Sequence, residues 1–150
     1  MRVNTQFPIA FHALMMIACF KEARVTSDMI AQSAGCNAVT IRNIFVKLRK
    51  AGLLSVKTGT GGTALGRPAE DITLWDIYTA VEVDQADEIF KIHANSSGAC
   101  PVGGQVRSLL SPHLNNAVQA MKAELSKTSL RQLLDELAHR PPNLQEGPEQ

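Results

Sequence analysis

The stretch NAVTIRNIFVKLRKAGLLSVKTGTGG, residues 37–62, carries the clearest structural pattern of this 150-residue chain. Asn37 is a favourable N-cap and Gly52 a favourable stop signal, so the sequence predicts a helix between them. Its apolar residues recur at i, i+3, i+4 and i+7, the spacing of one buried helix face: Ile41, Ile44, Phe45 and Leu48. Two short β-type runs, 53–57 and 63–65, follow, and the glycines between them favour a tight hairpin tip.

Two further helices are predicted before this stretch. An apolar run at 7–20 indicates a buried helix, with Cys19 on its apolar face and therefore expected as inert core. Thr26 or Ser27 can cap a second, short helix, which Gly35 ends. The order of two helices, a tight turn, a basic helix and a glycine-tipped hairpin is that of a winged helix-turn-helix domain. We therefore predict a mainly α fold with a small β-hairpin wing.

The run 7–20 can also be read as a targeting or membrane segment, but its features argue against this. It has 14 residues, fewer than the ~20 needed to cross a bilayer, and Lys21 and Glu22 follow at once without a small-residue cleavage site. Three cysteines at irregular spacing, without a Cys-x-x-Cys pair, indicate neither a disulfide framework nor a zinc site. We expect a soluble cytoplasmic protein with reduced thiols and no membrane partner.

Basic charge is concentrated in one part of the chain. The segment from Met29 to Ala69 contains no Asp or Glu and six Lys and Arg residues, a local charge of +6 in a chain whose net charge is +1. The remainder holds nine basic and 14 acidic residues, a charge of −5. Because the acid-free segment coincides with the predicted turn, helix and hairpin, it favours binding to double-stranded DNA over a merely solvated helix face.

The predicted recognition helix and hairpin supply the candidate DNA contacts. Arg42 and Asn43 carry hydrogen-bond donors for base edges, while Lys47 and Lys50 are expected to contact phosphates. The hairpin glycines bring the backbone close to DNA, and the cations at its base add phosphate contacts. The full candidate set is Asn37, Val39, Thr40, Arg42, Asn43, Lys47, Lys50, Lys57, Thr58, Gly59, Thr60, Gly61, Gly62 and Arg67. A winged helix that binds another protein is the alternative.

The rest of the chain is predicted to be helical around a polar linker. Periodicity indicates a fourth helix at 73–83, a long helix at 106–125 and a last helix that starts near Thr128. Pro112 either kinks the long helix or follows Ser111 as the first residue of a new one. The predicted division is a DNA-binding domain at 1–83, a linker or sensor loop at 84–104, dimerisation helices at 105–140 and a disordered tail at 141–150.

The long helix carries an apolar seam that one chain has little else to cover. The seam residues are Val106, Leu110, Leu114, Ala117, Val118, Met121 and Leu125. A second copy of the helix would cover the seam, so we predict a homodimer. Packing of the seam against the chain's own core is the alternative.

Four blocks of the sequence together resemble the Rrf2 family of bacterial transcription regulators. They are residues 44–54 (IFVKLRKAGLL), 58–62 (TGTGG), 72–78 (ITLWDIY) and 100–103 (CPVG). The resemblance implies a homodimer in which the long helix dimerises and two winged domains read a palindromic operator, and we expect a repressor. The hairpin departs from the family's usual form, in which an arginine and an aromatic residue stand where this chain has Thr58 and Thr63.

Some members of the family hold an iron–sulfur cluster through three cysteines in the loop before the dimer helix. This chain has one cysteine there, Cys100, with His93 nearby, so we expect no cofactor and no metal. Cys100-Pro101 is instead expected to begin a helix, whose dipole favours a thiolate and hence a thiol switch. A purely structural role for Cys100 fits the sequence equally well. Cys36 and Cys19 are the second choices for a thiol switch. A regulator of the same fold that senses an iron–sulfur cluster or a small ligand is the alternative.

An enzyme is not expected, because the sequence shows no catalytic constellation. The acidic cluster Asp84, Asp87 and Glu88 is typical of a solvated segment. The glycine-rich hairpin lacks the following helix of a phosphate-binding loop.

Overall fold

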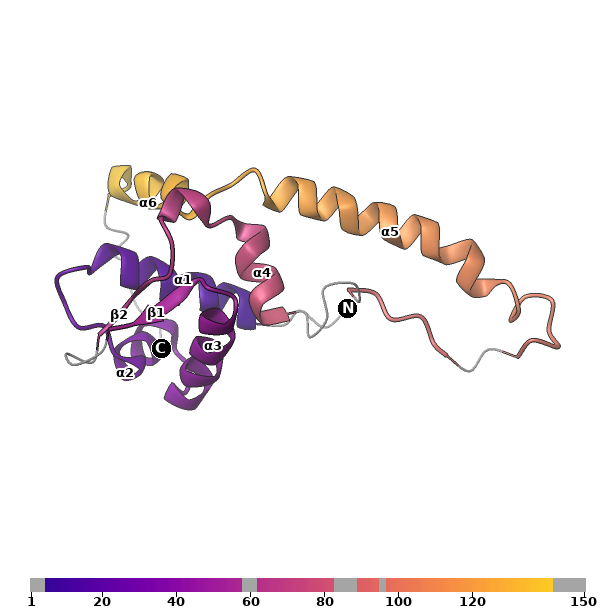
Figure 1. Ribbon diagram of the computed structural model, residues 1–150, viewed down its shortest axis with the longest axis horizontal. Coiled ribbons are helices and arrows are strands. Elements are labelled where there is room, and N and C mark those ends of the chain that lie inside the picture. Colours follow the sequence, from indigo (N-terminus) through magenta and orange to yellow (C-terminus); the bar gives the residue numbers. More distant parts are fainter. Residues whose placement is uncertain (1–4, 58–61, 83–88, 95–96, 142–150) are drawn as a thin grey trace, which may run out of the picture.

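Six α-helices, a short 3-10 helix and a two-stranded hairpin form the part of the chain that the computed structural model describes, residues 5–57, 62–82, 89–94 and 97–141 (Figure 1). The order is α1 (Gln6–Cys19), α2 (Ser27–Ala34), α3 (Ala38–Lys50), β1 (Leu54–Val56), β2 (Thr63–Leu65), η1 (Ala69–Asp71), α4 (Leu74–Glu82), α5 (Val106–Leu125) and α6 (Leu130–His139). The mainly α fold with a small β-hairpin is therefore confirmed.

The turn between α2 and α3 is built from the expected local signals. Thr26 caps α2, since its side chain accepts a hydrogen bond of 3.2 Å from the Met29 backbone N–H. Gly35 ends this helix in the left-handed region at φ 68°, which only glycine adopts at little cost. Asn37 then caps α3 by accepting from the Val39 backbone N–H at 2.8 Å. These contacts fix the angle between the two helices.

One core joins the first four α-helices, the hairpin and α6. Its largest fully buried side chains are Leu14, Ile30, Ile41, Ile44, Leu48, Leu53, Ile72, Ile77 and Leu130. The apolar stripe predicted for α3 is thus buried, and the helix presents its other face outward.

The hairpin pairs antiparallel, with Leu54 opposite Leu65 and Val56 opposite Thr63. Just beyond β1, the Lys57 backbone N–H donates to the Gly62 carbonyl at 2.8 Å, which continues the pairing by one step. The expected hairpin tip, 58–61, lies outside the described residues.

Helix α5 is a long arm that begins far from the core and runs back toward it, and α6 then lies on the core (Figure 1). Pro112 lies inside a continuous α5, so the alternative in which a new helix starts after Ser111 is wrong. The sequence groups α6 with α5 in residues 105–140, but Leu130 is fully buried in the core beside α1, and its backbone N–H donates to the Ile72 carbonyl at 2.7 Å. Helix α6 therefore packs on the winged domain.

Candidate nucleic-acid interface

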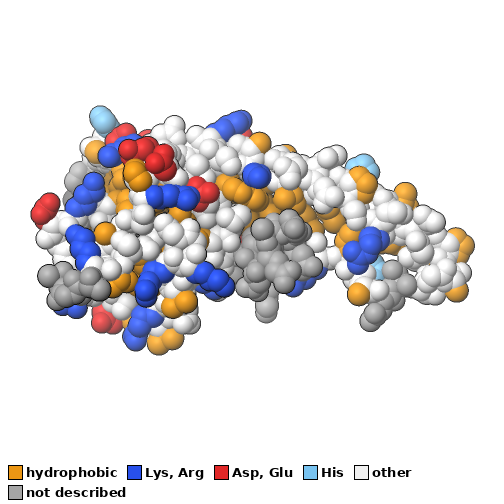
Figure 2. All heavy atoms as spheres, in the orientation of Figure 1, with side chains coloured by type: hydrophobic (Ala, Val, Ile, Leu, Met, Phe, Trp, Pro, Cys, Tyr) orange, Lys and Arg blue, Asp and Glu red, His pale blue; other side chains and the backbone are white. Residues whose placement is uncertain are grey.

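The outward face of α3 is the most prominent candidate surface for DNA. Its exposed residues fall at spacings of three, four and seven, which places them on one stripe along the helix. They are Val39, Arg42, Asn43, Val46, Arg49 and Lys50. Figure 2 shows Lys and Arg side chains gathered over this part of the molecule. The stripe offers hydrogen-bond donors, positive charge and two apolar groups to a ligand.

Arg49 belongs to this stripe, although the predicted contact set omits it. It follows Arg42 by seven residues, or two helical turns, so that the periodicity of the sequence contains the signal. Arg49 and Lys50 also lie in the last turn of α3, where cations stabilise a helix C-terminus. Their charges therefore support the helix as well as the surface.

Lys47 does not share the outward direction of the stripe. Its Nζ donates to Gln6 Oε1 at 2.8 Å and to the Val81 carbonyl at 3.2 Å, and the residue is half-buried. The lysine thus connects α3 to α1 and α4. As a phosphate contact it stays a prediction, and the structure gives its ammonium two partners within the chain.

The other predicted contacts of the helix and hairpin differ in exposure. Asn37 is exposed, but its side-chain oxygen is occupied by the cap of α3, and Thr40 is half-buried. Lys57 is exposed at the end of β1, and Gly62 is half-buried before β2. The predicted contacts at the hairpin tip lie outside the described residues: Thr58, Gly59, Thr60 and Gly61.

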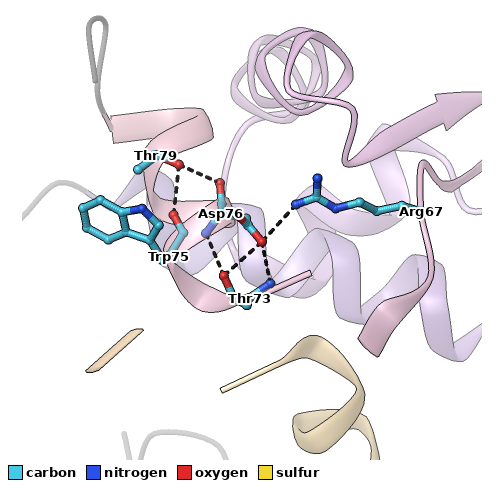
Figure 3. Close-up of polar contacts among 5 residues, drawn as sticks. All are labelled: Arg67, Thr73, Trp75, Asp76 and Thr79. Carbon is cyan, nitrogen blue, oxygen red and sulfur yellow. Dashed lines mark hydrogen bonds and ion pairs between the residues drawn. The ribbon is translucent and has the colours of Figure 1, made fainter. Parts of the chain in front are cut away.

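Arg67 follows the hairpin and is paired within the chain (Figure 3). Its Nη2 lies 2.9 Å from Asp76 Oδ2, which also accepts from the backbone N–H and the hydroxyl of Thr73, both at 2.9 Å. The Asp76 backbone N–H donates back to Thr73 Oγ1 at 3.2 Å, so these two residues form a reciprocal cap at the start of α4. Arg67 therefore anchors the exit of the hairpin to α4, and its role as a phosphate contact stays a prediction.

The three cysteines occupy different environments. Cys19 is exposed, so its expected place in the core is wrong: it stands in the last turn of α1, at the rim of a hollow of about 940 Å³ between α1, the hairpin and α6. Cys36 is half-buried against the core. Cys100 is exposed in a turn.

The turn that carries Cys100 differs from the predicted helix start. Helix α5 begins at Val106, so Pro101 is not its first residue. Two backbone donors nevertheless face the exposed sulfur: hydrogen bonds from the N–H groups of Gly103 and Val102 lower the pKa of the Cys100 thiol. The thiolate predicted here is favoured by a turn and not by a helix terminus.

The apolar seam of α5 is only partly covered in the single chain. No residue of α5 is buried, and none belongs to the core cluster of the described residues. Leu110 is 42% exposed, and the neighbouring Leu109, which the predicted seam omits, is 66% exposed. The seam therefore does not join the main core of the described residues, and its cover by a second copy stays a prediction. Along one side of α5, Phe90, Ile92 and Ala94 line a hollow of about 490 Å³ together with the seam residues Leu114 and Val118.

Two properties of the described residues bear on other classes of protein. No group of three or more His, Cys, Asp or Glu side chains is arranged to hold a metal ion there. No helix among the same residues is both long and apolar enough to cross a membrane.

Comparison with known proteins agrees with this architecture. A model of the Rrf2 family, described as an iron-dependent transcriptional regulator, matches residues 3–136. YwnA of Bacillus subtilis strain 168, which is named as an HTH-type transcriptional regulator, is 30% identical over 135 residues that cover 90% of this chain and 98% of YwnA.

Two solved structures are similar over most of their length. One, described as a transcriptional regulator from Lactobacillus plantarum, is 25% identical with a TM-score of 0.73 and covers 91% of both chains. The other, CymR (YrzC), the global cysteine regulator of B. subtilis, is 22% identical with a TM-score of 0.63, covers 90% of this chain and 97% of its own, and shows the shared fold.

These relatives are transcriptional regulators and not enzymes. The family match spans nearly the whole described length, from α1 into α6. The winged helix-turn-helix order and the basic outward face of α3 agree with DNA binding. The chain belongs to the Rrf2 family of winged-helix transcriptional regulators.

Proposed function

We propose that this protein is a homodimeric, sequence-specific DNA-binding repressor that reads a palindromic operator through α3. The observation that carries the proposal is the exposed stripe of α3, which combines Arg42, Asn43, Arg49 and Lys50 within a segment free of acidic residues. The width of the DNA major groove admits one helix, and guanidinium and amide groups are the donors that read base edges there. The hairpin beside α3 supplies Lys57 for a contact with the sugar-phosphate backbone of the DNA.

The homodimer is supported by the partly exposed seam of α5, none of whose residues is fully buried in the single chain. A half-exposed apolar face on a helix of 20 residues is stabilised when a second copy covers it, and a two-fold axis then relates the two winged domains. Two recognition helices related in this way fit half-sites separated by about one helical turn of DNA, roughly 34 Å. A palindromic operator follows from that symmetry.

Charge supports the orientation of this dimer on DNA. The segment that includes α3 and the hairpin has a charge of +6, whereas the rest of the chain has −5. The acidic excess lies in residues 70–88, which hold seven acidic and no basic residues, so the duplex attracts the first segment and repels this second one. The start of α4, with Glu70 and Asp71 just before it, is therefore expected to face away from the DNA.

Cys100 is the proposed point of regulation, through oxidation of its thiolate. The residue is exposed, and the backbone N–H groups of Gly103 and Val102 lower the pKa of its thiol. A thiolate attacks the O–O bond of hydrogen peroxide, forms a sulfur–oxygen bond and releases hydroxide, leaving sulfenic acid. Because Cys100 stands in the turn before α5, this change alters the start of the proposed dimer helix.

The cysteine content between α4 and α5 bears on the iron named in the family description. An iron–sulfur cluster needs several thiolate ligands, and Cys100 is the one cysteine between α4 and α5. The described residues also contain no group of three side chains arranged for a metal ion. This donor set does not fit a cluster.

The DNA proposal is tested by titrating duplexes from the protein's own promoter with the full-length chain at two salt concentrations. Fluorescence anisotropy is expected to show a binding constant that falls steeply with salt, because each neutralised phosphate releases counterions. A scrambled duplex is the control and is expected to bind at least about a thousandfold more weakly. A flat salt response would contradict the proposal and favour the protein-binding alternative.

A further inference from the structure

Two valines stand on the outward stripe of α3. Val39 is 55% exposed and Val46 is 64% exposed, whereas the apolar residues of the opposite face are fully buried. They are seven residues apart and therefore lie on one line along the helix, with Arg42 and Asn43 between them. Neither valine contributes to the core cluster of the described residues.

Valine does not stabilise these exposed helix positions in the free protein as well as other residues would. An exposed helix position favours alanine or a long polar residue over a β-branched one, and an exposed isopropyl group gains little from burial. Both valines stand on the stripe assigned above to DNA. Their side chains are therefore placed to gain contacts when α3 is covered by a ligand.

The groups exposed in the major groove determine which base an apolar valine side chain selects. The thymine C5 methyl is the one methyl group on the base edges there, and the nitrogen and oxygen groups donate or accept hydrogen bonds. An isopropyl group packed on a polar edge leaves that edge without a partner, which is unfavourable. A valine in the groove therefore favours thymine.

The spacing of the two valines sets the spacing of the thymines. Seven residues of α-helix span about 10 Å, and base pairs follow each other every ~3.4 Å along the duplex. We propose that Val39 and Val46 select thymine methyl groups at two positions in each operator half-site, separated by at most about three base pairs because the groove is inclined to the duplex axis, on either side of the bases read by Arg42 and Asn43. This inference rests on the proposed DNA reading by α3.

The test first selects operators from random duplexes with the full-length protein, and then replaces each thymine in turn by deoxyuridine. Deoxyuridine keeps the base pair and the O4 acceptor but lacks the methyl group. The wild-type protein is expected to lose about fourfold in affinity at each of two thymines, the effect of burying one methyl group less. Thymines elsewhere in the half-site are expected to tolerate the replacement.

Variants then assign each thymine to a side chain. Val39→Ala is expected to bind thymine and uracil equally at one position, and Val46→Ala at the other, while each keeps the penalty at the remaining position. Both variants favour the helix, because alanine has the higher helix propensity. Val102→Ala is the control, since Val102 is 69% exposed in the loop before α5, and it should keep both penalties.

Three outcomes would overturn the inference. If no thymine responds to deoxyuridine, or if the penalties persist in both valine variants, the valines do not read methyl groups, although salt-dependent specific binding still supports the proposed function. If no sequence is selected and binding does not respond to salt, the DNA reading itself fails, and the valine assignment fails with it.

Discussion

The guanidinium of Arg67 lies 2.9 Å from the carboxylate of Asp76 and so joins the exit of the hairpin to the first turn of α4. The same carboxylate completes the cap of α4 with Thr73, whose backbone is bridged to Ser129 just ahead of α6. The wing is thereby connected, through one carboxylate, to the helices that precede and follow the α5 arm.

The first prediction concerns stability. Asp76→Ala removes an N-terminal cap and a partly exposed ion pair, and we expect the free energy of unfolding to fall by about 1–2 kcal/mol, most of it from the cap. Urea denaturation measures the loss. Glu124→Ala is the control, because it breaks an ion pair with Lys127 whose side chains are 75% and 70% exposed. Equal losses in both variants would contradict the structural role of Asp76.

The second prediction separates cations that contact DNA from cations that hold the fold together. Lys50→Gln is expected to weaken binding to all sequences alike and to reduce the salt slope by about 1, because one phosphate contact is lost. Arg67→Gln is expected to leave the slope unchanged, since the guanidinium is paired with Asp76. Anisotropy titrations over a series of salt concentrations give both slopes. A reduced slope in Arg67→Gln would restore Arg67 as a phosphate contact.

The third prediction concerns base preference. Arg42 is exposed near the start of α3, where a recognition helix meets base edges. Arg42→Ala is expected to relax the preference at one base pair of each half-site by about 1–3 kcal/mol. Selection from random duplexes reveals the change, with Gln119→Ala on the exposed face of α5 as the control. An intact preference in Arg42→Ala would mean that α3 lies differently in the groove.

The local parts of the fold could be predicted because their causes are local. The caps at Thr26 and Asn37, the left-handed Gly35 and the buried stripe of α3 each depend on residues within a few positions of one another. Such signals are present in any short window of sequence.

The direction of long side chains could not be predicted in this way. Lys47 finds its partners 41 and 34 residues away in the sequence, and Arg67 pairs with a carboxylate that has already capped a helix. The docking of α6 depends in the same way on Leu130 meeting a distant core. Periodicity assigns a residue to a face, but long-range packing decides what that face meets.

The fourth prediction concerns the dimer. Leu114 lies in the middle of the α5 seam and is half-buried in the single chain. Leu114→Asp is expected to weaken the proposed dimer at least about a hundredfold, because burial of an unpaired carboxylate costs several kcal/mol. Analytical ultracentrifugation measures the dissociation constant. Gln119→Glu, also on α5 but outside the seam, is expected to remain dimeric, and a dimeric Leu114→Asp protein would contradict the proposed interface.

The fifth prediction concerns the reactivity of Cys100. Backbone N–H groups, that of Gly103 above all, lower the pKa of its thiol, so that the folded protein holds more thiolate at neutral pH than the unfolded chain does. In a Cys19→Ser, Cys36→Ser background, the alkylation rate is expected to rise with a midpoint at lower pH in buffer than in concentrated urea. Gly103→Ala should move the folded midpoint back up, because an added Cβ would lie 2.5 Å from the Ser97 carbonyl oxygen and displace the turn. Gly98→Ala, where an added Cβ meets open space, should leave the midpoint unchanged. Coincident midpoints in buffer and urea would show that the turn does not activate Cys100 and would remove the chemical basis of the proposed switch.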